Sequence, residues 1–231
     1  MVNPGHSSNV AQAASDPQHS PEVRVLSGLR VGGIVLAGGK STRMGTSKAL
    51  LPFGPETMLQ RVVRILGAIV SPIVVVAAPA QELPALPADV IVTHDEREAR
   101  GPLEGLRAGL KALPESVEAA YVTSCDVPLL VPGFVTEMIE LSKGFDVAVM
   151  EIDGFPHPLS AIYRRATLPY IEDLLAHDRL RPVFLYERVR TRRVSPSEIT
   201  ADPDLHTLRN LNTQEDYEQA LASAGFNRPD R

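Results

Sequence analysis

A glycine pair followed by two basic residues is the stretch of this chain whose residue types most clearly suggest chemistry. Gly38 and Gly39 end a short apolar run, and Arg43 and Lys48 come soon after them. Glycine lets the backbone turn sharply and come close to a ligand. Backbone N–H groups beside two permanent cations make a binding site for a polyphosphate. The alternative is a tight turn after a strand, with incidental surface cations.

Two well-known phosphate-binding motifs do not match this loop. The dinucleotide fingerprint G-x-G-x-x-G is absent after the apolar run. Gly39-Lys40-Ser41 matches the last three positions of a P-loop, but that motif needs a glycine five residues earlier, where this chain has Ile34. The loop therefore predicts a polyphosphate site of another kind.

An acidic residue stands where a second apolar run ends. Asp126 follows the run 119–124, and open α/β sheets bind ligands at the carboxyl ends of their strands. One carboxylate together with substrate phosphates is a usual coordination for Mg²⁺, which makes Asp126 a candidate metal ligand. The alternative is a capping residue of the next helix. The neighbouring Cys125 has no evident catalytic partner and is predicted to be a buried packing residue.

Three further segments carry polar side chains that could contact a ligand. Asp95 lies in a charged loop ahead of Gly101, where a helical stretch opens and could present N–H groups. His157 lies between two prolines, which favour extended backbone. Asn210 and Asn212 precede a segment that also reads as an ordinary capped helix start. Each position therefore has a plain structural interpretation beside the functional one.

The longest motif resembles a known family. The string Leu36-Ala-Gly-Gly-Lys-Ser-Thr-Arg-Met-Gly-Thr-Ser-Lys48, continued by 49–54, resembles the signature of nucleotidyltransferases with a Rossmann-like fold. The closest subfamily is that of the molybdenum cofactor guanylyltransferases, whose C-D-x-P metal motif is matched by Cys125 to Pro128. The similarity extends over residues 30–222, which is nearly everything outside the two tails.

The resemblance implies a role for each matching position. The implied catalytic residues are Arg43, Lys48 and Asp126, with Asp126 holding Mg²⁺. The implied nucleotide-binding residues are Leu36, Ala37, Gly38, Gly39, Lys48, Asp95, Gly101 and Asp126. The implied acceptor-binding residues are His157, Asn210 and Asn212.

The reaction that the resemblance implies is transfer of GMP from GTP to the phosphate of molybdenum-molybdopterin, with release of pyrophosphate. It also implies molybdenum-insertion and molybdoenzyme-maturation proteins as candidate partners. Two departures concern the base and the acceptor: Ser47 stands where the guanylyltransferases usually have Asp, and Ala78-Pro79 stands where relatives often place Asn. The same chemistry with CTP or on a sugar 1-phosphate, and a nucleotide sensor without catalysis, remain alternatives.

The elements that must position these residues alternate along the chain. Short apolar runs at 31–37, 72–78, 90–93, 119–124, 146–151 and 159–163 predict strands, separated by helical stretches at 57–68, 103–113, 134–141 and 166–177. Two short segments, 183–186 and 191–194, and a closing helix at 214–222 follow. The alternation predicts an α/β fold of three layers, α/β/α, with a mostly parallel Rossmann-like sheet of about seven strands. The resemblance implies the nucleotide-diphospho-sugar transferase type.

Composition bounds the remaining possibilities. Residues 29–226 are predicted to form one domain, and 1–28 and 227–231 to be unstructured tails. The net charge of −5 argues against a nucleic-acid-binding surface. The single cysteine excludes an intrachain disulfide and a zinc site of several thiolates, which fits a reducing cytoplasm. No apolar stretch is long enough for a membrane span, and we expect a monomer.

Overall fold

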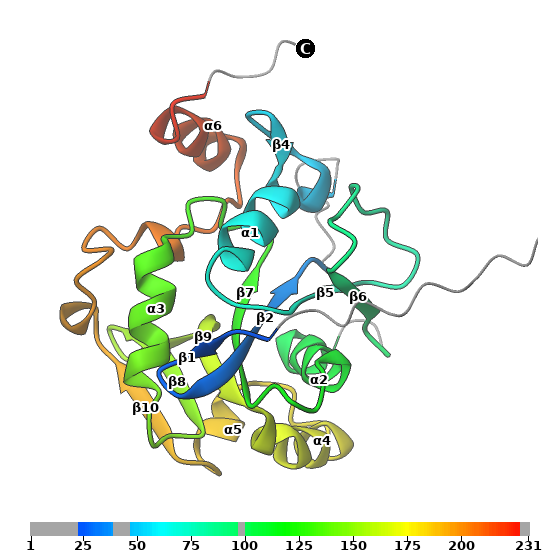
Figure 1. The fold of residues 1–231 in the computed structure, drawn as a ribbon, viewed down its shortest axis with the longest axis vertical. Coiled ribbons are helices and arrows are strands. Elements are labelled where there is room, and N and C mark those ends of the chain that lie inside the picture. The colour runs from blue at the N-terminus through cyan, green and yellow to red at the C-terminus, as the bar shows by residue number, and fades with distance from the viewer. Residues whose placement is uncertain (1–22, 39–46, 97–99, 227–231) are drawn as a thin grey trace, which may run out of the picture.

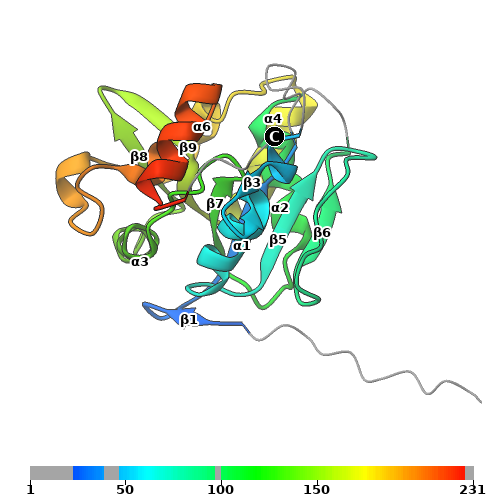
Figure 2. The ribbon, with the colours of Figure 1, turned by 90° about the horizontal axis from the view of Figure 1, so that it is seen from above.

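The sheet that carries the site runs through the middle of the molecule. A computed structural model describes residues 23–38, 47–96 and 100–226. Seven strands follow one another in the order β10-β8-β9-β7-β2-β5-β6. The short strand β1 pairs antiparallel with the first residues of β2. Figure 2 shows β8 and β9 at one end of this order and β5 and β6 at the other. The bounds are β1 Val25–Leu26, β2 Leu29–Leu36, β5 Ile73–Ala77, β6 Ile91–His94, β7 Ala119–Ser124, β8 Val147–Ile152, β9 Phe155–Arg164 and β10 Thr191–Val194.

Most strand pairs are parallel, as the alternation predicts. The central run β7-β2-β5-β6 is parallel throughout, and β10 is parallel to β8. The exception is β9, which runs antiparallel to both β7 and β8. The predicted class, an α/β fold with a mostly parallel sheet of about seven strands, is confirmed.

Helices cover both faces of the sheet (Figure 1). One face packs against α1 and α3, and the other against α2, α4 and α5. Their bounds are α1 Met58–Gly67, α2 Pro102–Ala112, α3 Pro132–Leu141, α4 Leu168–Ala176, α5 Val183–Tyr186 and α6 Gln214–Ser223, with short 3₁₀ turns η1 Lys48–Leu50, η2 Arg165–Thr167, η3 Pro196–Glu198 and η4 His206–Leu208.

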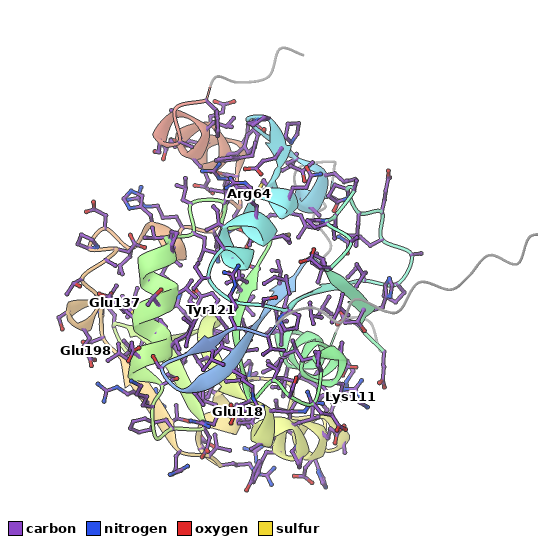
Figure 3. The ribbon with its side chains drawn as sticks, in the orientation of Figure 1. Arg64, Lys111, Glu118, Tyr121, Glu137 and Glu198 are labelled. Atoms are coloured by element: carbon purple, nitrogen blue, oxygen red, sulfur yellow. The ribbon has the colours of Figure 1, made fainter. Side chains whose placement is uncertain are left out.

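The strands are apolar on both faces because both faces are covered. In β2, Val31 and Val35 belong to the cluster under α1 and α3, whereas Ile34 and Leu36 belong to the cluster under α2. Successive side chains of a strand point to opposite faces, so a strand buried on both reads as a continuous apolar run. Tyr121 of β7, labelled in the middle of the molecule in Figure 3, is fully buried in the first of these clusters.

The last helix packs on a small third cluster rather than on the sheet. α6 lies beside α1 and the hairpin of β3 Pro52–Phe53 and β4 Glu56–Thr57 (Figure 1). Its start follows the predicted cap: the Thr213 hydroxyl accepts from the Asp216 N–H, and the Asp216 carboxylate accepts from the Thr213 N–H. This capping box fixes the chain just before α6, where Asn212 lies.

Two expectations need correction, and one segment that had no assigned type is a helix. Residues 25–28 are not part of an unstructured tail, because Val25–Leu26 form β1 and turn back along β2. The strand predicted at 159–163 begins at Phe155 and reverses direction, which no local pattern encodes. The apolar segment Val183–Tyr186 is the short helix α5. Among the described residues, no helix is long and apolar enough to cross a membrane.

Candidate active site

The candidate site lies where four neighbouring parallel strands end. The Ala37 N–H, just beyond β2, donates to the Val76 carbonyl of β5 over 2.8 Å, and the Asp95 N–H, just beyond β6, donates to the Ala77 carbonyl over 3.1 Å. The Cys125 N–H, just beyond β7, donates to the Leu36 carbonyl over 3.0 Å. The predicted loop and both predicted acids therefore lie along one edge of the sheet, at its carboxyl end.

Lys48 joins two of the predicted residues. Its Nζ donates to Oδ2 of Asp126 and to Oδ1 of Asn212, each over 2.9 Å. The Lys48 and Asp126 side chains are only 17% and 18% exposed, so the ion pair is partly shielded from water. The structure thus brings together the end of the basic loop, the end of β7 and the segment before α6.

Two further contacts hold this cluster in place. The Ser124 hydroxyl donates to Oδ1 of Asp126, so both oxygens of that carboxylate are engaged. The Leu211 N–H donates to the Asp126 backbone carbonyl over 2.9 Å, which fastens the chain ahead of α6 to the end of β7. Asp126 is therefore fixed in orientation by its own strand and by a distant segment.

The cluster presents oxygen atoms to a cation. A carboxylate oxygen of Asp126 and an amide oxygen of Asn212 both face the single positive charge of Lys48. Oxygen atoms of this kind, completed by phosphate and water, are the ligands that Mg²⁺ takes. Among the described residues no three His, Cys, Asp or Glu side chains gather into a metal site. A divalent ion therefore fits here together with substrate oxygens rather than in a cage built from the protein alone.

On the other side of β2, Asp95 lies beside the glycine of the loop. A Cβ added to Gly38 would stand 3.5 Å from Oδ2 of Asp95 and 3.3 Å from the Ala78 backbone nitrogen. Oδ1 of Asp95 is buried and has no hydrogen-bond partner among the residues described. A buried acceptor without a donor is costly unless a ligand supplies one. Oδ1 lies on the α2 side, 3.4 Å from a Cβ added to Gly105, and Oδ2 is the oxygen on the Gly38 side.

A buried ion pair lies behind Asp95. Glu104 of α2 is only 3% exposed and accepts from Arg107 over 2.7 Å, and Arg107 also donates to Glu96 over 2.8 Å. Burial raises the pKa of Asp95, the negative charge of Glu104 raises it further, and Arg107 opposes both. Protonation of Asp95, or an N–H donor from a ligand, would therefore offset the cost of burying its negative charge.

The other predicted residues lie around these two groups. Leu36 ends β2 and is buried, and Gly101 caps α2 with a φ of +72°, a conformation that favours glycine. His157 is in extended backbone on β9 opposite Met150, and burial lowers its pKa. His157 and Asn210 make no hydrogen bond to Lys48 or Asp126 within the described part of the chain. Gly39 and Arg43 lie outside the described residues.

Cys125 is a packing residue, as predicted. It is 5% exposed and belongs to the core cluster beneath α1 and α3. Burial raises the pKa of its thiol to about 12, and the adjacent Asp126 charge raises it as well. A thiol that stays protonated at neutral pH is not a nucleophile.

Sequence reasoning missed three contributors to this edge of the sheet. The Gln81 side chain bonds to Ala37, Ser47 and Ala78, but it stands in no recognisable motif. Glu104 falls in the helix predicted at 103–113, and the apolar positions around it could have shown that this helix, and Glu104 with it, is buried. Ser124 is the last residue of the predicted strand 119–124, and a hydroxyl two residues before an acid is a usable signal.

Comparison with known proteins identifies the family of this chain. The family described as the MobA-like NTP transferase domain matches residues 33–193. A probable molybdenum cofactor guanylyltransferase from Pelotomaculum thermopropionicum is 31% identical over 88% of this chain and 98% of its own length. One with the same name from Mycobacterium avium is 36% identical over 85% and 97%.

A solved structure supports the fold. Molybdopterin-guanine dinucleotide biosynthesis protein A from Archaeoglobus fulgidus superposes with a TM-score of 0.69, covering 84% of this chain and 98% of that one at 18% identity. The family match runs from within β2 to within β10 and includes Lys48, Asp95 and Asp126. The chain belongs to the MobA-like NTP transferase family and is a nucleotidyltransferase.

Proposed function

We propose that this nucleotidyltransferase transfers GMP from GTP to the terminal phosphate of molybdopterin, with Mg²⁺ as the metal ion. The observation that carries the proposal is the pairing of two features at one sheet edge. A cation-and-oxygen cluster of Lys48, Asp126 and Asn212 lies on one side of β2. The Asp95 carboxylate, one oxygen of which has no hydrogen-bond partner in the part of the chain that the structure describes, lies on the other. The names of the curated relatives support guanine and the molybdenum cofactor.

The proposed reaction needs no covalent intermediate with the protein. An oxygen of the acceptor phosphate attacks the α-phosphorus of GTP, the new O–P bond forms in line, and the bond to the β-phosphate breaks to release pyrophosphate. No side-chain nucleophile is needed because the acceptor is already an anion. Positioning and stabilisation of negative charge supply the rate. We assign the stabilisation of this negative charge to Lys48, and the same role to Arg43 of the loop.

The metal ion would be held by Asp126. NTP transferases of this family generally use a divalent metal. A bound Mg²⁺ would act as a Lewis acid and neutralise negative charge that develops on the phosphates. Ser124 keeps one carboxylate oxygen of Asp126 oriented, and Lys48 contacts the other. The Asp126 carboxylate would hold the ion, and the neighbouring Lys48 ammonium would add a positive charge for the phosphates.

Asp95 supplies the basis for base selection. The Watson–Crick edge of guanine carries two neighbouring N–H groups, which match a carboxylate acceptor, whereas cytosine offers a different pattern. Gly38 leaves the space beside Asp95 open, because any side chain there would meet Ala78 and Asp95. His157 and Asn210, together with Asn212, are assigned to the acceptor side.

The test compares nucleotides first and acceptors second. With Mg²⁺ present, GTP is expected to raise the melting temperature more than CTP, UTP or ATP, because stabilisation grows with ligand concentration over Kd. Pyrophosphate is then expected from GTP only when molybdopterin is added. A larger shift with CTP would remove the guanylyl assignment and keep the reaction class. Tight GTP binding with no release in the presence of any acceptor, sugar 1-phosphate included, would identify a sensor instead.

A matched pair of variants links this activity to the site. Asp126→Asn is expected to lower turnover on the order of 100-fold, because it removes the charge that holds the metal. Asp204→Asn makes the same change at an exposed position and serves as the control. Equal turnover of the two variants would exclude Asp126 from the mechanism.

A further inference from the structure

The Gln81 side chain connects the two ends of the glycine loop, the segment between Ala37 and Ser47, to the residue that follows strand β5. Its Nε2 donates to the Ala37 carbonyl over 2.9 Å and to the Ser47 hydroxyl over 3.3 Å. Its Oε1 accepts from the Ala78 N–H over 2.9 Å. Ala37 is the residue before Gly38, and Ser47 is the residue before Lys48. One side chain therefore holds the residues on either side of the segment that carries the loop.

The partner types require an amide at this position. The Ala78 N–H can only donate and the Ala37 carbonyl can only accept, which fixes the oxygen of Gln81 toward β5 and its nitrogen toward the loop. The two hydrogens of that nitrogen are shared between the two ends of the loop. A carboxylate could keep the bond to Ala78 but would lose both donors. A methionine would fill the same volume and lose all three contacts.

Gln81 is itself held by a short turn. Its backbone N–H donates to the Ala78 carbonyl over 3.1 Å, so backbone and side chain both bind the residue that follows β5. A residue whose backbone N–H and side-chain amide are both hydrogen-bonded loses little further conformational entropy when its side chain binds the loop. The contact therefore provides a preformed tie between β5 and the two loop ends.

The hydrogen bond from Gln81 to Ser47 affects Lys48 through the peptide bond that joins Ser47 to Lys48. Ser47 directly precedes Lys48, whose ammonium lies 2.9 Å from Asp126. Closing a loop at its ends lowers the conformational entropy that ligand binding must still remove. A displacement of about 1 Å at a reacting group costs on the order of 100-fold in rate. The position of Ser47 is thus a sensitive point for catalysis.

We propose that Gln81 is a positioning residue for nucleotidyl transfer: it fixes Ala37 and Ser47 on β5 and thereby sets where Lys48 meets the phosphates. The inference rests on the proposed role of Lys48. One of the two departures from the family pattern, Ser47, is a direct side-chain partner of Gln81. The contact to Ala78 uses the backbone N–H and does not depend on the residue type there.

The experiment compares Gln81→Met and Gln81→Glu with a control, Gln219→Met, which removes an exposed amide on α6. Gln81→Met is expected to lower kcat for pyrophosphate release about 10-fold and to raise the KM for GTP, while the melting temperature stays near that of the control. A kcat and KM within twofold of wild type would overturn the proposal.

The glutamate variant separates positioning from general damage. At pH 8 Gln81→Glu carries a carboxylate against the Ala37 carbonyl and is expected to be as slow as Gln81→Met. Towards pH 5.5 its protonated form regains one O–H donor, so its rate relative to wild type at the same pH is expected to recover several-fold. A ratio that does not change with pH would count against the hydrogen bonds as the cause.

Hydrogen exchange gives a readout that does not depend on turnover. Amides of residues 37–48 are expected to exchange faster in Gln81→Met than in Gln219→Met. Unchanged exchange there would overturn the tie itself. If wild-type protein releases pyrophosphate and Gln81→Met does so equally well, only the role of Gln81 fails. If wild-type protein is inactive with every nucleotide, the proposed function fails, and the exchange result still decides whether Gln81 holds the loop ends.

Discussion

The ammonium nitrogen of Lys48 lies 2.9 Å from Oδ2 of Asp126, which places the only described cation of the basic loop directly on the candidate metal ligand. The two residues come from the end of the glycine loop and the end of β7, which lie 78 positions apart in the sequence. Removing one partner of a shielded ion pair leaves the other without compensation. The relationship makes Lys48 and Asp126 a unit, and their variants are expected to be strongly non-additive.

Replacing Lys48 tests the charge that this unit delivers. Lys48→Met keeps most of the length of the side chain and removes its charge, and it is expected to lower turnover at least about 100-fold. The measurement is the initial rate of pyrophosphate release at saturating GTP. Lys111→Met removes an exposed lysine of α2 and is the matched control. Turnover of Lys48→Met within a few-fold of that control would contradict the mechanism.

The KM for GTP is expected to depend on the ionisation of Asp95. The pKa of Asp95 is raised by burial and by Glu104, so protonation begins at a higher pH than for an ordinary aspartate. The carboxylic acid offers fewer acceptor positions to guanine than the carboxylate does. KM is therefore expected to rise as the pH falls towards the raised pKa. Asp95→Asn is expected to have a KM about 10-fold higher at neutral pH that varies less with pH.

The same residue is expected to lower the stability of the free protein. Because the folded-state pKa of Asp95 is raised, the native state binds the proton more tightly than the unfolded chain. The destabilisation therefore develops as the pH rises from about 3.8 through the raised value, and it is complete at neutral pH. Asp95→Asn is expected to melt at a higher temperature than wild type at pH 7, with a smaller difference at pH 4. A lower melting temperature at pH 7 would refute this assignment.

Gly38 is expected to control the space for the base. An alanine there would place its Cβ 3.3 Å from the Ala78 nitrogen and 3.5 Å from Asp95, which narrows the site without a severe clash. Gly38→Ala is expected to raise the KM for GTP several-fold while the KM for CTP changes less. Steady-state kinetics with both nucleotides measures the ratio. Equal changes for the two nucleotides would show that the glycine serves the backbone alone.

Cys125 is expected to take no part in catalysis and to react slowly with thiol reagents in the folded protein. Its thiol is buried and its pKa is raised to about 12, so little thiolate exists at neutral pH. The folded protein is expected to react with a thiol reagent only at the rate at which it opens. Cys125→Ala is expected to keep turnover within about threefold of wild type, since the alanine leaves only a small cavity. Rapid labelling of the native protein together with loss of activity would contradict both statements.

The part of the site that could be predicted from sequence is the part encoded by local pattern. Lys48 and Asp126 follow apolar strands, and parallel strands bring their carboxyl ends to one edge, so their proximity follows from general geometry. The contact from Lys48 to Asn212 spans 164 positions and depends on how α6 docks. No periodicity encodes that docking, and Asn212 entered only through family resemblance.

Two features of the fold escaped prediction for a related reason. The reversed direction of β9 is set by its partners β7 and β8, whereas its residues read like those of any buried strand. Gln81 lies in a turn without regular structure, and its three partners come from three separate segments. Side chains that connect distant segments carry no signal in their own neighbourhood.

The contact between Leu211 and Asp126 has a consequence for the order in which a newly made chain becomes competent. Ribosomes release the N-terminal part first, so β2, β5 and β7 emerge with Lys48 and Asp126 well before residue 211. A nascent chain can pair these two charges early. It gains the backbone tie of Leu211 and the Asn212 oxygen only after the segment ahead of α6 has emerged and docked. A chain that ends before residue 211 therefore lacks part of the site, even with every strand of the sheet already made.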